Sequence, residues 1–173
     1  MPVTISGGSP TFSSGYQGGT IISGTAQAST SGTAITFTSI PSWVKRITIM
    51  LAGVSTNGST AYLVQLGTSS GFVTSGYLGA VSREGTVGST NFSTGFQITG
   101  TIAGTSFLQG NVVLTNITSN TWTENSQLGY SDGAATAQGA GYLTLSGVLT
   151  QVRVTTVNGT DVFDAGTINI LYE

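Results

Sequence analysis

The sequence predicts an all-β protein, built as an antiparallel β-sandwich of the jelly-roll type. Most ordered segments alternate apolar with polar residues, and β-branched or aromatic side chains fill the apolar positions, as in strands with one buried face. Twenty-six glycines interrupt the chain, so we expect no helix of ordinary length. Many short strands separated by frequent turn signals indicate a sandwich or a jelly roll.

The segment 34–66 is expected to form three strands joined as a β-meander. The strands are placed at residues 34–40, 44–51 and 62–66. Pro41 ends the first strand, because proline has no backbone N–H to donate to a sheet. Asn57-Gly58 tolerates the positive φ angles of a type I′ turn, so it is expected to join the second strand to the third.

Alternation within these three strands predicts which side chains are buried. Arg46 and Thr48 are expected to face solvent or a partner chain, because they alternate with larger apolar residues. Ile47, Ile49 and Leu51 are expected to face the core. Ile35 and Phe37 share the apolar face of the first strand, which is expected to have one buried face, and Tyr62, Val64 and Leu66 share one face of the third.

The rest of the chain is expected to continue as strands with short connections. The strands are placed at residues 20–28, 72–81, 96–102, 106–116, 122–130, 142–151, 153–157 and 167–172. Residues 87–95 and 131–141 are rich in small residues, so both are expected to be loops. Asn158-Gly159 repeats the dipeptide at 57–58 and is expected to mark another tight hairpin.

One folded domain is expected at residues 20–173, preceded by an arm at residues 1–19. A single domain near this length of 173 residues buries roughly 70% of its unfolded surface, so it needs no covalent staples. The arm is rich in Gly, Ser and Pro and has only isolated apolar residues, so it cannot form its own core. We expect either that it orders against another molecule or that it is a frayed terminus.

The composition excludes several kinds of chemistry. The chain has neither cysteine nor histidine, so it lacks disulfides, the commonest metal ligand and the commonest general base. No cofactor or metal is expected, and no basic cluster suits a nucleic acid. The first residues lack the features of a signal peptide, and no apolar run is long enough for a membrane span. Synthesis in a cytoplasm, without export by that route, is therefore expected.

The low charge of the chain predicts self-association. Charged residues make up 6% of the sequence, against about 25% in typical domains. Monomeric β-proteins usually rely on charge to prevent pairing between sheet edges. The simplest explanation is that much of the surface is buried against other copies of the chain. The alternative is that a surface rich in hydroxyl groups is soluble enough alone.

Two patterns resemble catalytic motifs but have simpler interpretations. The segment GTSSG at residues 67–71 matches the G-x-S-x-G nucleophile elbow, which requires a strand-to-helix turn and a histidine base. Neither is expected, so the segment is interpreted as a loop. Asp161 and Asp164 flank the last predicted hairpin and suggest a hydrolytic pair or a calcium site. Turn aspartates that accept hydrogen bonds from local backbone donors are the simpler interpretation.

The candidate binding residues are aromatic and charged side chains. Aromatic rings can stack on sugars, although packing in the core or in an interface is the simpler role for each ring. Trp43 follows a proline turn and is the aromatic residue that we most expect in an interface. The candidate interface or receptor residues are Trp43, Arg46, Tyr77, Arg83, Glu84, Trp122, Tyr130 and Asp132.

Five segments resemble a module of tailed bacteriophages and prophages. They are FTSIPSWVKRIT at residues 37–48, GVSTNG at 53–58, VRVTTVNGT at 152–160, FDAG at 163–166 and INILY at 168–172. The module is similar to a C-terminal domain of tail fibres and also occurs as small stand-alone virion proteins. The resemblance covers about residues 20–173 and leaves out residues 1–19.

The resemblance implies a non-enzymatic part of a phage particle that is structural or binds a receptor, and it implies a trimer. Because no extended shaft precedes the domain, a small protein attached by its first residues to a fibre, a baseplate or a capsid is expected. We expect a host surface glycan or protein to meet the loops at residues 82–93 and 131–141. The alternatives are a capsid decoration protein and a polysaccharide-cleaving enzyme, for which the clustered carboxylates are missing.

Overall fold

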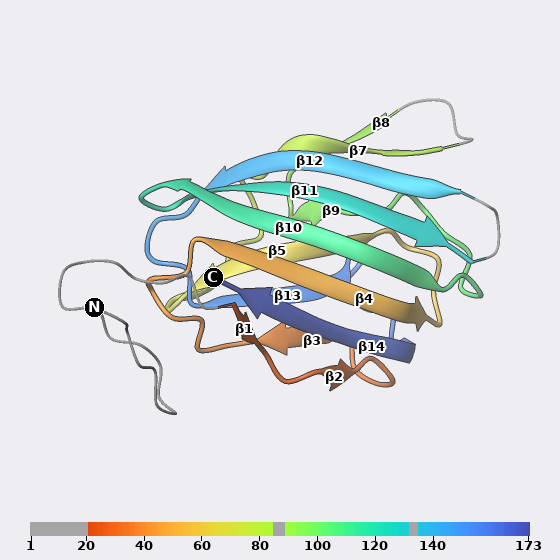
Figure 1. Cartoon of the computed structure of the whole chain (residues 1–173). Coiled ribbons are helices and arrows are strands. Elements are labelled where there is room, and N and C mark those ends of the chain that lie inside the picture. Colours follow the sequence, from red (N-terminus) through yellow and green to blue (C-terminus); the bar gives the residue numbers. More distant parts are fainter. Residues whose placement is uncertain (1–20, 85–88, 132–134) are drawn as a thin grey trace, which may run out of the picture.

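A computed structural model describes residues 21–84, 89–131 and 135–173 (Figure 1). Within these residues the chain forms fourteen β-strands and no helix. The strands are β1 (Ile22–Ser23), β2 (Gln27–Ala28), β3 (Ala34–Phe37), β4 (Arg46–Thr56), β5 (Tyr62–Thr68), β6 (Gly71–Phe72), β7 (Leu78–Arg83), β8 (Ser89–Phe92), β9 (Phe96–Gln97), β10 (Leu108–Thr118), β11 (Thr121–Tyr130), β12 (Thr136–Thr144), β13 (Gln151–Thr156) and β14 (Phe163–Tyr172).

The strands form two antiparallel sheets that pack face to face (Figure 1). The larger sheet has nine strands in the order β1-β14-β4-β10-β11-β12-β7-β8, and β2 also pairs with β14. The smaller sheet has five strands in the order β3-β13-β5-β6, and β9 also pairs with β5. The predicted all-β fold and its antiparallel sandwich arrangement are therefore confirmed.

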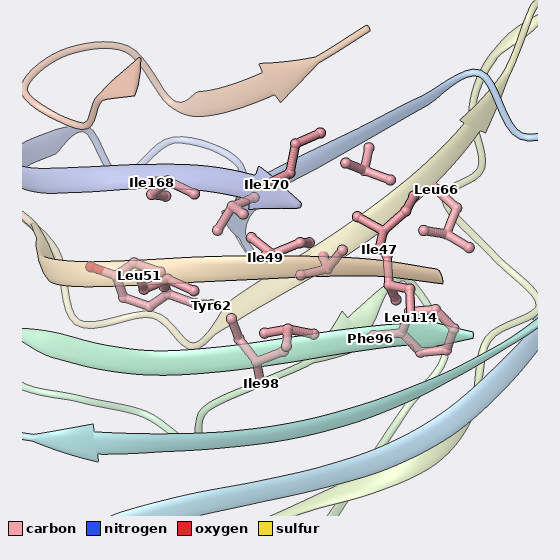
Figure 2. Close-up of a cluster of buried hydrophobic side chains, with 14 of the residues drawn as sticks. Ile47, Ile49, Leu51, Tyr62, Leu66, Phe96, Ile98, Leu114, Ile168 and Ile170 are labelled. Atoms are coloured by element: carbon pink, nitrogen blue, oxygen red, sulfur yellow. The ribbon is translucent and has the colours of Figure 1, made fainter. Parts of the chain in front are cut away.

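The predicted buried faces meet in the space between the sheets (Figure 2). Ile47, Ile49 and Leu51 of β4 face Tyr62 and Leu66 of β5, and all five side chains are at most 4% exposed. The other residues of these predicted faces, Ile35, Phe37 and Val64, belong to the same core. At roughly 1.5–3 kcal/mol for each large apolar side chain, this layer dominates the free energy of folding.

The predicted β-meander is wrong. β4 lies in the larger sheet, whereas β3 and β5 lie in the smaller sheet, where β13 separates them. Alternation reveals which face of a strand is buried, but it does not reveal which strand is its neighbour. Every residue of β5 is buried, so this strand needs cover on both faces and a central place in its sheet.

The two Asn-Gly turns are not hairpins, because each carries the chain from one sheet to the other. The first follows β4, and the second follows β13. The Asn57 N–H donates to the Val162 carbonyl over 2.9 Å, and the Val162 N–H donates to Asn57 Oδ1 over 2.9 Å. Gly159 has a φ of +68°, a left-handed conformation that glycine adopts readily, and it lies in the crossover from β13 to β14 and not in a hairpin.

Several predicted boundaries are also wrong. Residues 131–141 were expected to be a loop, but β12 begins at Thr136 and pairs along its length with β11. Its small residues leave room for the ring of Phe92, which a Cβ on Gly141 would approach to 2.8 Å. The predicted strand 72–81 is divided between β6 and β7, and 87–95 includes β8. Of the predicted strand 96–102, only β9 is a strand. Of the predicted strand 142–151, residues 142–144 belong to β12, and the next strand, β13, begins at Gln151.

Glu124 is the one charged side chain in the core among the described residues. It points inward from β11, is 3% exposed, and neither carboxylate oxygen has a hydrogen-bond partner within the described chain. Burial raises the pKa of Glu124 from 4.5 to about 7, because removal from water disfavours the charged form of the carboxyl group. An uncompensated carboxylate therefore destabilises the folded chain at alkaline pH.

Replacing Glu124 with glutamine should remove a pH dependence of stability. Because the folded pKa lies above the unfolded value of 4.5, the proton on Glu124 stabilises the fold fully below pH 4.5. This stabilisation is lost as the pH rises through about 7. Between about pH 5 and 8 the stability of Glu124→Gln should therefore rise by about 2 kcal/mol relative to the natural chain, as measured by urea unfolding. The exposed Glu84→Gln should keep the natural slope, and an unchanged slope in Glu124→Gln would contradict this prediction.

Gly166 should be far less replaceable than Gly159. Gly166 lies at a bulge in β14 with a φ of +95°, and a Cβ there would lie 2.6 Å from the backbone Cα of Val54. Gly159 also has a positive φ, but a Cβ there meets nothing within 4 Å. Gly166→Ala should cost about 3 kcal/mol or more in urea unfolding, against about 1 kcal/mol for Gly159→Ala. Equal losses would show that the backbone around Gly166 yields freely.

Candidate functional site

The sandwich has two ends with different surface chemistry. We call one the Trp43 end, which includes residues 38–45, the turn at 119–120, the connection at 145–150 and the C-terminus. Backbone hydrogen bonds hold these segments together, from Lys45 N–H to the Glu173 carbonyl (2.7 Å) among others. We call the other the Asn57 end, which includes both Asn-Gly turns and the C-terminal ends of β7 and β11. The C-terminus marks the Trp43 end in Figure 1.

The Trp43 end carries most of the large apolar side chains that are exposed. Trp43 is 42% exposed, and its ring centroid lies 6.0 Å from that of Tyr172. The Arg46 Nη1 atom lies 3.4 Å from Glu173 Oε1, in an ion pair that solvent reaches. The exposed large apolar residues at or near this end are Ile21, Trp43, Leu78, Ile117, Tyr142 and Val148. The structure thus places Trp43 and Arg46 together on the surface.

Tyr77 and Trp122 are core residues, so their interpretation as exposed sugar-stacking aromatics is wrong. Tyr77 is fully buried, and its hydroxyl accepts a hydrogen bond from the Leu66 N–H (2.8 Å) and donates to the Val73 carbonyl (3.1 Å). Burial raises the pKa of Tyr77 to about 12. Trp122 is 4% exposed and belongs to the main apolar cluster. For both residues the alternative of core packing is correct, because each ring points inward from its position in the sandwich.

Three of the predicted site residues meet at the Asn57 end. The Arg83 guanidinium lies over the ring of Tyr130, with 4.4 Å between Cζ and the ring centroid. The Glu84 N–H donates to the Thr136 carbonyl (2.8 Å), and the Thr136 hydroxyl donates to Glu84 Oε2 (3.0 Å). Tyr130 is only 5% exposed, so it supports Arg83 and does not present a free face. Asp132, and parts of the loops predicted at 82–93 and 131–141, lie outside the described residues.

Asp161 and Asp164 have structural partners, but the predicted local backbone donors are wrong, because the backbone donor Thr60 and the hydroxyl donor Ser55 lie far away in the sequence. Asp161 accepts hydrogen bonds from Asn158 Nδ2 (2.6 Å) and from the Thr60 N–H (3.0 Å). Partial burial opposes ionisation, but these hydrogen bonds outweigh it and lower the pKa of Asp161. Asp164 accepts a hydrogen bond from the Ser55 hydroxyl. The described part of the chain contains no group of three or more Asp, Glu, His or Cys residues placed to hold a metal ion.

The GTSSG segment at residues 67–71 forms the tight connection between β5 and β6. Thr68 pairs with Gly71 across this hairpin, so the segment joins a strand to a strand. A nucleophile elbow joins a strand to a helix. The geometry therefore agrees with the interpretation as a Gly- and Ser-rich loop.

The outer face of the larger sheet is broad and uncharged. Side chains that alternate with the core residues point outward from β4, β10, β11, β12 and β7, and Asn111, Gln127 and Gln138 form a row across three neighbouring strands. A hollow of about 420 Å³ lies over this part of the face. The outward residues in the middle of this face are Thr48, Met50, Ala80, Ser82, Asn111, Val113, Asn125, Gln127, Gln138 and Ala140. We call this set the amide face.

Arg153 lines a second hollow, of about 300 Å³, on the outer face of the smaller sheet. The sequence analysis did not select Arg153 as a site residue. A signal was present, because Arg153 occupies the outward phase between the buried residues Val152 and Val154. Its partner across the sheet, Gln65, could not be identified without knowing that β13 pairs with β5.

Comparisons with models of protein families, with curated proteins and with solved structures found no match. In the residues that the structure describes, no helix is long and apolar enough to cross a membrane. The structure defines the fold class of the chain as an antiparallel β-sandwich.

Arg83 should contribute more to stability than Arg46. The Arg83 guanidinium stacks on a buried ring and donates to the Thr101 carbonyl (3.4 Å), whereas Arg46 forms an exposed ion pair. Arg83→Ala should lower the free energy of unfolding by about 1 kcal/mol, and Arg46→Ala by less than about 0.5 kcal/mol. Urea unfolding at matched ionic strength measures both, and a larger loss for Arg46→Ala would contradict the assigned roles.

Proposed function

We propose that this chain is a non-enzymatic structural protein of a tailed-phage particle. In this proposal it is a component of a tail fibre or tail tip, assembles as a homotrimer of jelly-roll domains and contributes to recognition of the host surface. The amide face carries the proposal. A sheet face of this width without charge is unusual for a monomer, which relies on charged side chains to remain unassociated.

The amide face is suited to contact with a second copy of the chain. Its side chains are amides, hydroxyls and small apolar groups, so covering it would not bury an unpaired charge. Arg46 and Glu84 lie toward its margins, as charged residues lie at the rim of a protein interface. The proposed trimer would use this face for the contacts between subunits.

The two ends of the sandwich support separate roles for attachment and recognition. The described chain begins at the Trp43 end, where Ile22 pairs with Tyr172 and exposed apolar side chains gather. In the proposal, residues 1–19 dock this end on another tail, baseplate or capsid protein. The Asn57 end, with Arg83 and Glu84, then faces away from the particle and toward the host.

The sequence resemblance supports the virion setting, and the crossovers support the jelly-roll assignment. Chain connections pass between the sheets at both ends, after β3 and β12 at the Trp43 end and after β4 and β13 at the Asn57 end. Asp161 and Asp164 each accept hydrogen bonds from neighbouring side chains, which supports a structural and non-enzymatic role for them.

Charge placed on the amide face should dissociate the assembly without unfolding the subunit. Asn111 and Gln127 are direct cross-strand partners, so the double variant Asn111→Asp with Gln127→Glu places two negative charges side by side in the proposed interface. Sedimentation velocity should show a trimer for the natural chain and a monomer for the double variant. The matched control, Ser70→Glu on the β5–β6 hairpin, should remain trimeric. A concentration-independent monomer for the natural chain would reject the trimer.

The virion role is tested on the particles of the phage that encodes the chain. Gold-labelled antibody should mark the tail end, and purified protein should compete with the phage for adsorption to host cells. Label spread over the head would instead support the capsid decoration protein. Absence of label, or absence of competition at saturating protein, would reject the virion role or the recognition role, respectively. Release of reducing ends from host glycans would support the polysaccharide-cleaving enzyme.

A further inference from the structure

A polar groove on the outer face of the smaller sheet is built around one arginine. Gln65 of β5 and Arg153 of β13 are cross-strand partners, and both point outward because Val64, Val152 and Val154 point into the core. The groove has a volume of about 300 Å³ and runs toward the turn at Asn158. It lies on the opposite side of the sandwich from the amide face.

The Arg153 side chain is held in place before any ligand arrives. Its Nε donates to Gln65 Oε1 over 2.8 Å, and its guanidinium lies 4.3 Å above the centre of the Phe72 ring. Gln65 is itself only 6% exposed, and its Nε2 donates to the Thr94 carbonyl over 2.7 Å. The guanidinium is therefore restrained on one edge and one face, which reduces the entropy lost when it binds a ligand.

The remaining donors of Arg153 are available to an anion. Within the described residues, Nη1 and Nη2 make no hydrogen bond, and no carboxylate lies within ion-pair distance of Arg153. Among the residues that the structure describes, no acidic side chain lines the groove. The two terminal nitrogens of a guanidinium can pair with two oxygens of a carboxylate or of a phosphate. Arg153 is the one cation in the described lining of the groove, which suits the single charge of a carboxylate better than the higher charge of a phosphate.

The rest of the groove suits the hydroxyl groups of a sugar. Thr33, Thr74 and Thr94 line it, all three are exposed, and no hydrogen bond from their hydroxyls exists within the described chain. A hydroxyl can both donate and accept, so these three threonines can exchange hydrogen bonds with sugar hydroxyls without a charge. Leu63 adds an apolar portion to the lining.

We propose that this groove binds an acidic sugar residue of a glycan, with the sugar carboxylate on Arg153. The threonine hydroxyls then contact the ring hydroxyls of the sugar. The inference rests on the proposed function, because it names the ligand class through which the chain would recognise a host surface. The binding itself is a property of the purified chain and can be tested without a particle.

The test is a titration of the full chain with three probes, followed by NMR amide shifts and isothermal calorimetry. D-glucuronate should bind and shift the amide signals of Gln65, Arg153 and Thr155. D-glucose, which lacks only the carboxylate, should bind about 10-fold more weakly or not at all. Inorganic phosphate should not match glucuronate. Equal binding of glucose, equal binding of phosphate, or no binding of glucuronate would each overturn the proposal.

Matched variants separate a role in binding from a role in folding. Arg153→Gln should weaken glucuronate binding by about 10-fold or more, whereas Arg46→Gln, which makes the same charge change at the Trp43 end, should leave it unchanged. Arg153→Lys keeps the charge but loses the paired geometry, so it should fold normally and still bind more weakly. Natural affinity in both Arg153 variants would overturn the proposal.

The outcomes also separate this inference from the proposed function. If glucuronate binds the groove but the protein is absent from particles or does not compete for adsorption, the site stands and the proposed function fails. If the protein labels the tail and competes for adsorption but glucuronate does not bind, the proposed function stands and the acidic-sugar site fails.

Discussion

The packing of β4 and β14 against β5 and β13 determines the rest of the structure. Apolar side chains from these four strands fill the space between the sheets, with β4 and β14 in the larger sheet and β5 and β13 in the smaller sheet. Because β4 leads to β5 and β13 leads to β14, both crossovers must fit at the same end of the sandwich. The reciprocal hydrogen bonds between Asn57 and Val162 join these crossovers, so the two halves of the core close together. Because the inner faces of the two sheets pack against each other, the alternate side chains of each strand point outward and form the two outer faces.

The two outer faces differ chemically because the sheets differ in their number of strands and in how much of each outer face other segments cover. The larger sheet presents alternating residues over many strands, and its outward row of Asn111, Gln127 and Gln138 is open to solvent. The smaller sheet is narrower, and Thr94, Gly95 and Arg153 lie against the outward side chain of Gln65, so that Gln65 is buried although it points outward. The outer face of the larger sheet is open and uncharged, so it is suited to contact with another protein subunit. The outer face of the smaller sheet has a groove that contains Arg153, so it is suited to a small polar ligand.

The sequence was a good guide to the inward phase of strands and a poor guide to their neighbours. Alternation identified Ile47, Ile49 and Leu51 correctly, because the side-chain period of a strand is a local property. Pairing is not local, so the predicted meander failed: β13 pairs with β5, and the partners Gln65 and Arg153 are 88 positions apart in the sequence. Packing was the simpler role expected for Tyr77 and it is correct, but the partners of its hydroxyl, the Leu66 N–H that donates to it and the Val73 carbonyl that accepts from it, could not be identified from the sequence. Arg153 was missed because its contacts with Gln65 and Phe72 depend on which strands are neighbours in the sheet.

The chain has four basic residues, and their contacts differ in whether an acidic group is present. Of the four basic residues in the sequence, Arg46 meets an acidic partner in Glu173, and Lys45 donates to the amide oxygen of Asn116. Arg83 and Arg153 instead lie over aromatic rings, which hold a guanidinium without neutralising its charge. For Arg153, the neutral partners Gln65 and Phe72 fix the position of the positive charge and leave its terminal nitrogens facing a groove. Because no carboxylate within the described chain pairs with Arg153 and its terminal nitrogens make no hydrogen bond there, its position favours a ligand that brings the negative charge itself.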